Sequence, residues 1–135
     1  MNATASPLQV VSRIYDAMAR KDIDALLELV DPAVVITQDD ALPWGGRHAG
    51  REGLVEFSLA LVGNIDSAVS AEAMFQAGEQ VVQYGRTRGT VRANGAAFDI
   101  PECHVWTVRD GRAVAADFFI DSAAMLDALA TNAPG

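Results

Sequence analysis

The chain has 135 residues, of which half are hydrophobic and 21% are charged. This length and composition are typical of one globular domain with a buried core, and they exclude a disordered or membrane-embedded chain. The formal net charge of −8 at pH 7, without a cluster of basic residues, argues against a nucleic-acid partner.

The cysteine content and the N-terminus indicate the compartment. Cys103 is the only cysteine, so the chain cannot form an internal disulfide or a cysteine-rich metal site. The first residues contain no basic segment followed by an apolar one, and no apolar run is long enough to span a membrane. We therefore expect a cytoplasmic protein with no metal, no cofactor and no membrane partner.

The first forty residues predict a helical hairpin followed by a strand. Ser6-Pro7 is typical of a helix start, and apolar residues at helical spacing follow as far as Met18. Asp22 caps a second, shorter helix, which Asp31-Pro32 breaks. Residues 33–38 are β-branched and predict a short strand.

The rest of the chain predicts a loop, a helix and then a run of strands. We expect a loop over residues 39–50, because its proline and glycines interrupt a strand, and a third helix from about Arg51 to Gly63. A short helix capped by Asp121 ends the fold, and residues 1–6 and 131–135 are expected to be frayed tails. Four long strands lie between the two helices: Ser67–Ala77, Val81–Arg92, Phe98–Val108 and Ala113–Ile120.

This order of elements predicts a fold class. Helices come early and strands late, which indicates an α+β fold within one domain over residues 1–135. Asn94-Gly95 and Asp110-Gly111 each predict a two-residue turn, so the strands form a meander. A curved sheet of such long strands wraps around the helical hairpin and the third helix and leaves a cavity, which is the natural ligand site.

The strand from Phe98 to Val108 carries the candidate site. Glu102, His104 and Trp106 alternate along it, so all three side chains point to one face. His104 is a candidate general acid or base because its unperturbed pKa lies near neutrality. Trp106 is expected to pack in the core or to line the pocket.

The sequence allows more than one set of contacts for Glu102 and His104. Glu102 could orient the imidazole of His104, or it could pair with Arg86 or Arg88 on the neighbouring strand. The alternative is that His104 is a buried histidine whose hydrogen bonds are satisfied by Tyr15 or Glu102.

Further candidates come from the first half of the chain. Tyr15 could donate a hydrogen bond to a developing oxyanion, and Asp40 or Gln38 could complete a proton relay at the pocket mouth. The register over residues 36–40 leaves two choices: one places Gln38 in the pocket with Asp40 beyond it, and the other places Thr37 and Asp39 there. Trp44, on the proline- and glycine-containing loop, is a candidate lid.

Several strings, taken in order, resemble the nuclear-transport-factor-2-like (NTF2-like) superfamily, more closely its SnoaL-like and ketosteroid-isomerase-like branch. They are residues 21–27, Leu42-Pro43-Trp44-Gly45-Gly46 with Gly50-Arg51-Glu52-Gly53, Val108-Arg109-Asp110-Gly111-Arg112, and Phe119-Ile120-Asp121. The resemblance implies a cone-shaped α+β barrel with a deep apolar pocket, commonly dimeric through the outer face of the sheet. Members include isomerases, polyketide cyclases, epoxide hydrolases and dehydratases.

The functional residues of these relatives are matched only in part. By the resemblance, the oxyanion acid of steroid isomerases falls at His104, and the aspartate of polyketide cyclases falls at Phe118. The isomerase tyrosine falls at Ile14, with Tyr15 next to it, and neither register of residues 36–40 places a carboxylate where the isomerase base belongs. The chain therefore lacks a complete copy of either machinery.

Two functions remain as hypotheses. The first is a cofactor-free isomerase, cyclase or hydrolase that acts on a small, apolar, oxygenated substrate. Its catalytic residues would be His104, Asp40 and Tyr15, and its ligand contacts would be Gln38, Trp44, Phe57, Glu102, Trp106 and Phe118. The second is a non-catalytic module that binds a hydrophobic ligand or forms a homodimer, with a pocket filled by its own side chains. A cavity of roughly 300 Å³ or more would favour an open ligand site.

Overall fold

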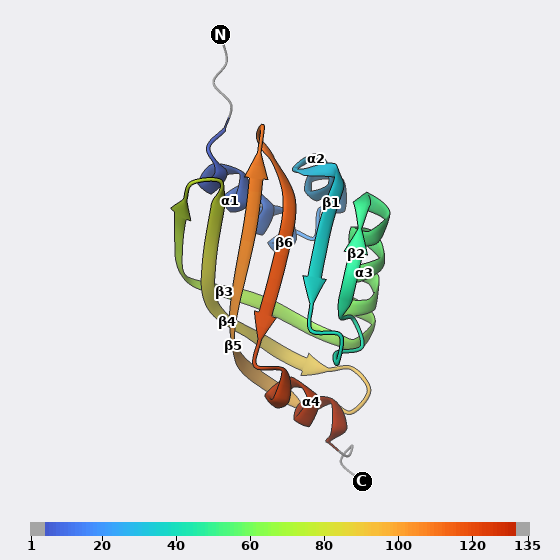
Figure 1. Ribbon diagram of the computed structural model, residues 1–135. Helices are drawn as coiled ribbons and strands as arrows, with labels where there is room; N and C mark the ends of the chain where they lie inside the picture. Colours follow the sequence, from blue (N-terminus) through green and yellow to red (C-terminus); the bar gives the residue numbers. More distant parts are fainter. Residues whose placement is uncertain (1–4, 132–135) are drawn as a thin grey trace.

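The computed structural model describes residues 5–131, so most of the predicted tails lie outside the described residues. Within that part, Ser6 is not frayed: its side chain accepts a hydrogen bond from the Gln9 amide and caps the first helix. Figure 1 shows the elements in order: α1 (Pro7–Ala19), α2 (Ile23–Glu28), β1 (Val30–Gln38), β2 (Gly46–Ala49), α3 (Gly50–Asn64), β3 (Ile65–Ala77), β4 (Gln80–Val91), β5 (Ala97–Arg109), β6 (Arg112–Ile120) and α4 (Ser122–Ala130).

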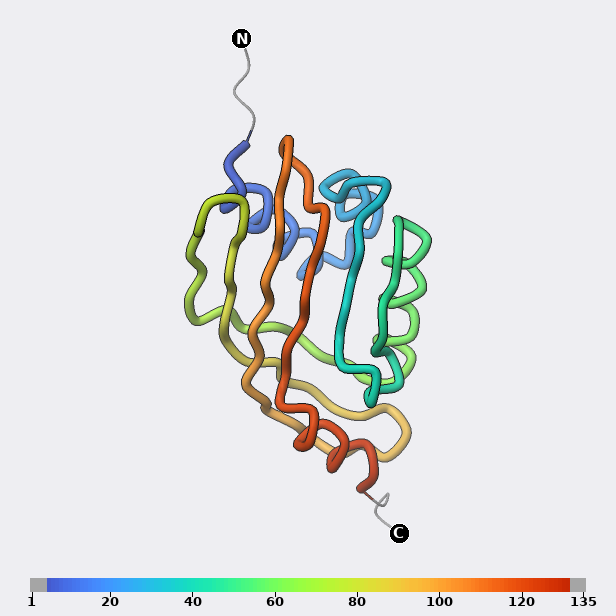
Figure 2. The backbone as a smooth tube through the Cα atoms, viewed as in Figure 1, coloured from blue at the N-terminus to red at the C-terminus, as the bar shows by residue number. Residues whose placement is uncertain are grey.

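The strands form one mixed six-stranded sheet in the order β2-β1-β6-β5-β4-β3. Strands β3 to β6 are the predicted antiparallel meander, and β1 joins it parallel to β6. The α+β prediction is therefore confirmed. The sheet is curved but not closed into a barrel, because β2 and β3 remain its edges. Figure 2 shows the lower parts of β3, β4 and β5 bending away from the upright strands.

Two glycines in β4 allow this bend. A side chain at Gly85 would overlap the carbonyl oxygen of Ser70, and one at Gly89 would overlap that of Asp66. Only glycine lets β4 approach β3 this closely. The curvature that leaves room for a site on the inner face thus depends on two residues without side chains.

Two local predictions were wrong in the first half of the chain. The predicted loop contains β2, whose residues 46–49 pair antiparallel with β1; Gly46 has a φ of +96° and turns the chain back into the sheet. Strand β1 also begins earlier than predicted and runs through Pro32. A register shift between Val30 and Val35 accommodates the proline, which cannot donate a ladder hydrogen bond.

The two hairpin predictions differ in outcome. Asp110-Gly111 is a two-residue turn between Arg109 and Arg112, as predicted, and both turn residues have positive φ. Asn94-Gly95 instead lies in a longer connection, because the Val91 amide bonds to the carbonyl of Ala96. The side chain of Asn94 is used elsewhere: it donates to carbonyls near the end of α4.

This longer connection sets the register of the site. A two-residue turn at Asn94-Gly95 would place Gln83 opposite Trp106. The observed pairing places Gln83 opposite His104. Both side chains point to the inner face of the sheet, because residues directly opposite each other on paired strands share a face.

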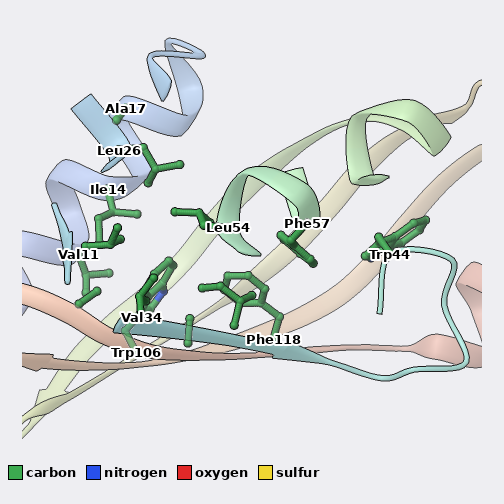
Figure 3. Packing of buried hydrophobic residues seen from close by; sticks show 14 of the residues in the cluster. Val11, Ile14, Ala17, Leu26, Val34, Trp44, Leu54, Phe57, Trp106 and Phe118 are labelled. Atoms are coloured by element: carbon green, nitrogen blue, oxygen red, sulfur yellow. The ribbon is translucent and has the colours of Figure 1, made fainter. Parts of the chain in front are cut away.

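The core lies between the inner face of the sheet and helices α1 and α3. Figure 3 shows Trp106 and Phe118 rising from the sheet toward Ile14 of α1 and Phe57 of α3. All four side chains are buried. Burial of each such side chain contributes roughly 1.5–3 kcal/mol relative to leaving it exposed. Among residues 5–131, no helix is both long enough and apolar enough to cross a membrane.

Candidate functional site

Five polar or aromatic side chains from three elements meet on the inner face of the sheet. Glu102, His104 and Trp106 come from β5, Gln83 from β4 and Tyr15 from α1. Gln83, Glu102 and His104 are almost fully buried. A polar group buried in this way is costly unless it is hydrogen-bonded, so the network among these groups decides what the site can do.

Tyr15 lies at the centre of the network. Its hydroxyl oxygen is 2.7 Å from Nδ1 of His104. It accepts hydrogen bonds from Nε1 of Trp106 at 2.9 Å and from Nε2 of Gln83 at 3.1 Å. The Tyr15 and His104 rings are stacked, 6.0 Å apart between centroids. The displacement of this tyrosine from the family position, noted in the sequence, does not prevent it from reaching His104.

The other nitrogen of His104 contacts Glu102. Nε2 of His104 is 3.2 Å from Oε2 of Glu102, and Nε2 of Gln83 donates to the same oxygen at 3.1 Å. The remaining oxygen of each partner, Oε1 of Glu102 and Oε1 of Gln83, is buried with no hydrogen-bond partner in the described structure. The alternative pairing of Glu102 with Arg86 or Arg88 is wrong, since both arginines pair with Asp99.

Burial shifts the pKa of each titratable group in the network. It raises the pKa of Glu102 to about 7, a rise that the Gln83 hydrogen bond opposes and the charge of Glu72 reinforces. It lowers the pKa of His104 to about 3 and raises the pKa of Tyr15 well above its usual range. At neutral pH the imidazole is therefore neutral, and Glu102 is the group poised to gain or lose a proton.

An apolar cavity of about 70 Å³ adjoins this network. That volume accommodates about two water molecules and is far smaller than the roughly 300 Å³ expected of an open ligand site. Phe57, Phe118 and Met125 are among the side chains that fill the remaining space. The lining residues are Met18, Gln38, Trp44, Phe57, Leu61, Ile65, Ser67, Val69, Thr87, His104, Phe118, Ile120 and Met125.

A second hollow, of about 390 Å³, lies where β1 and β6 end. Its walls include Thr37 and Asp117, whose side chains are hydrogen-bonded to each other across the two strands. Because these residues alternate with the buried Ile36 and Phe118, they lie on the outer face of the sheet. The larger hollow is therefore separate from the His104 network.

The structure resolves the register that the sequence left open. Gln38 lines the interior cavity and accepts a hydrogen bond from Nε1 of Trp44 at 2.9 Å. Trp44 is fully buried, so the predicted lid residue is packed against the cavity. Asp40 is exposed in a turn and does not line the cavity. Phe57 and Phe118 also line it, whereas Glu102 and Trp106 do not. Contact of these residues with a ligand stays a prediction.

Gln83 is the one member of the network that the sequence did not indicate. Alternation along the strand could have indicated it, because Val81 and Gln83 are two residues apart in β4 and both side chains point to the inner face of the sheet. Placing Gln83 beside His104 required the pairing of β4 with β5, and the Asn94-Gly95 dipeptide predicted that pairing incorrectly.

Comparison with known proteins identifies relatives of this domain. Residues 11–116 match the family model described as a SnoaL-like domain. An NTF2-like protein from Burkholderia thailandensis is 28% identical, with a TM-score of 0.89 over 95% of this chain and 100% of that one. An NTF2-like protein of unknown function from Burkholderia pseudomallei is 25% identical, with a TM-score of 0.87 over the same shares. TerC, co-crystallized with polyporic acid, is 20% identical, with a TM-score of 0.85 over 94% of this chain and 100% of that one. No curated protein sequence matches the chain.

Proposed function

The chain belongs to the SnoaL-like domain family, and from this premise we propose that its interior cavity binds a small, apolar molecule that carries an oxygen. The observation that carries the proposal is His104, which lines a mainly apolar cavity and whose Nε2 is 3.2 Å from the buried carboxyl group of Glu102 behind it. Protein pockets for small molecules typically combine apolar walls with a few convergent polar groups. The relative TerC, with the same fold, was crystallized with a small molecule, which supports ligand binding by this fold.

We place a cofactor-free proton transfer at this pair, of the kind that isomerisation, cyclisation or hydration requires. His104 is the acid/base residue: once the Tyr15 hydroxyl has moved off Nδ1, that nitrogen takes a proton from the substrate while Nε2 passes its own proton to Glu102, so the imidazole stays neutral. A carboxyl with a pKa of about 7 suits this exchange, since general acid–base catalysis is most efficient near the working pH. Tyr15 holds the imidazole in place at 2.7 Å. Asp40 has no part in this proposal.

A second function, a non-catalytic module, is favoured by the size of the cavity. About 70 Å³ is roughly half the 150 Å³ that holds benzene in an engineered protein cavity. In the catalytic case the side chains around the cavity must move to admit a ligand. In the non-catalytic case the network of Tyr15, His104 and Glu102 serves only to satisfy buried polar groups.

A cavity-enlarging variant distinguishes the two functions. Met125 of α4 is fully buried and lines the cavity, so Met125→Ala should enlarge the pocket at a stability cost of roughly 2–5 kcal/mol. We expect saturable binding of phenol, followed by tryptophan fluorescence, that is tighter in Met125→Ala than in the wild-type protein. Leu126→Ala changes the exposed neighbour on the same helix and should leave the affinity as it is. Failure of both the wild-type protein and Met125→Ala to bind would reject the ligand pocket and leave the module.

We also propose a homodimer through the outer face of the sheet, in the cytoplasm. Tyr84 of β4 and Phe119 of β6 flank Cys103 in one row across the outer face, and both are about half exposed. Adjacent exposed aromatic side chains of this kind mark interaction surfaces.

A charge at the β6 end of this row tests the dimer. Phe119→Asp is expected to convert a dimer to a monomer in analytical ultracentrifugation, because the carboxylate would be buried without a partner. Leu59→Asp places the same charge on α3, where the leucine is 69% exposed, and should leave the mass unchanged. Equal masses for the wild-type protein and both variants would contradict the proposed interface.

A further inference from the structure

Every hydrogen-bond donor of the His104 network is already used inside the protein. Trp106 and Gln83 are obligate donors through the nitrogens that contact the Tyr15 hydroxyl, so that oxygen is the acceptor in both bonds. The single hydroxyl proton of Tyr15 is then left for Nδ1 of His104. A neutral imidazole carries one proton, which must then lie on Nε2, the nitrogen 3.2 Å from Oε2 of Glu102.

The orientation of the Gln83 amide completes this assignment. Nε2 of Gln83 faces Tyr15 and Glu102 at 3.1 Å and Nδ1 of His104 at the longer distance of 3.3 Å. Both amide protons are thus used, and only the carbonyl oxygen lacks a partner. The flipped amide would bury two unpaired donors instead and would place its oxygen against Oε2 of Glu102. Buried unpaired N–H groups are rarer than unpaired carbonyl oxygens, so the observed orientation is favoured.

The groups left over are therefore acceptors. Oε2 of Glu102 accepts a hydrogen bond from Gln83 and lies 3.2 Å from Nε2 of His104, whereas Oε1 has no partner although the Glu102 side chain is fully buried. In the ligand-free protein, a proton on this carboxyl therefore sits on Oε1. On the same face of the sheet, Glu102 lies behind His104 and Ile120, both of which line the cavity. A ligand therefore reaches Oε1 only when these side chains move aside, as the proposed function already requires.

We infer that Glu102, when ionised, makes the polar side of this pocket a hydrogen-bond acceptor, and that the ligand presents an O–H group of an alcohol or a neutral phenol to Oε1 of Glu102. The inference deepens the proposed function and rests on it. It differs from the oxyanion stabilisation that the resemblance implied for Tyr15, because Tyr15 has no proton left to donate. An enolate or phenolate would face an unpaired carboxylate oxygen at low dielectric.

The surrounding charges point the same way. The titratable groups that bear on Glu102 are His104, Tyr15, Glu72 and Cys103. The first two are neutral at pH 7, and the charge of Glu72 raises the pKa of Glu102 further. No cation among these groups would offset an anionic ligand.

The test compares ligands of one shape that differ in their donor. At pH 8, where Glu102 is mostly ionised, phenol is expected to bind at least tenfold more tightly than its methyl ether, because a hydrogen bond to a charged acceptor is stronger than a neutral one. At pH 9, a nitrophenol that is ionised should not bind to the wild-type protein. In Glu102→Gln the preference for phenol over the ether should fall, and the ionised nitrophenol should gain affinity from the new amide donor. Glu72→Gln removes a nearby exposed charge without changing the acceptor and should keep the preference for phenol.

The outcomes separate this inference from the proposed function. Binding of the ether as tightly as phenol, or binding of the ionised nitrophenol at pH 9, would overturn the inference while preserving the pocket. If neither phenol nor its ether binds to the wild-type protein or Met125→Ala, the proposed function fails instead. The donor assignment has a ligand-free check as well: ¹⁵N NMR should show His104 protonated on Nε2 only, and a proton on Nδ1 would overturn the assignment.

Discussion

The wild-type protein is expected to lose roughly 3 kcal/mol of stability as the pH rises from 4.5 to about 7, and the Glu102→Gln variant is expected not to show this loss. The pKa of this carboxyl is 4.5 in an ordinary environment and about 7 in the folded protein. Within that window the unfolded chain releases the proton while the folded protein retains it. The free energy of unfolding therefore falls as the pH rises, and the loss is complete above pH 7.

Urea unfolding at pH 4.5 and pH 8 measures this effect. The stability of Glu102→Gln minus that of the wild-type protein should increase by roughly 3 kcal/mol between the two pH values. Glu56→Gln changes an exposed carboxylate on α3 and should show no such increase. A constant difference for Glu102→Gln would mean that Glu102 is ionised in the folded protein throughout, which contradicts a desolvated carboxyl.

His104→Leu is expected to show the opposite pH dependence. Burial lowers the pKa of His104 from 6.5 to about 3, so below pH 6.5 the unfolded chain binds a proton that the folded protein excludes. The wild-type protein should lose roughly 3 kcal/mol from this residue between pH 6.5 and pH 4, and His104→Leu should not. At pH 7 the variant carries its own cost of about 1–3 kcal/mol, because Tyr15 loses its acceptor.

The control for this variant is the other histidine. His48→Gln alters a half-buried residue that contacts loop carbonyls, and it should retain the acid-induced loss of the wild-type protein. If His104→Leu and the wild-type protein lose stability in parallel below pH 6.5, the folded protein contains an imidazolium paired with the Glu102 carboxylate. That result would reject the neutral imidazole on which the donor assignment depends.

The inner face of β5 could be predicted from alternation alone. Glu102, His104 and Trp106 share that face in the structure, because a strand exposes every second residue to the same side. The helix starts at Ser6 and Asp22 were equally predictable, since each side chain caps a local backbone amide. Local chemistry decides these features, and the sequence contains it.

Features that depend on pairing between distant segments could not be predicted in the same way. Strand β2 is only four residues long and exists because β1 offers it a hydrogen-bonding edge. Gln83 meets His104 because the connection after Val91 is longer than its Asn-Gly dipeptide indicates. The small interior cavity follows from the bend at Gly85 and from the packing of large side chains, neither of which has a local sequence signal.

The central claim is that the interior cavity is the ligand site and that Glu102, which lies behind His104 and Ile120 of the cavity wall, receives the hydroxyl group of the ligand. A crystal structure of Met125→Ala grown with phenol tests it most directly. We predict the phenol ring between Phe57, Phe118 and residue 125, with its hydroxyl oxygen about 2.7 Å from Oε1 of Glu102. Phenol in the outer hollow beside Thr37 and Asp117, with the interior cavity empty, would contradict the claim.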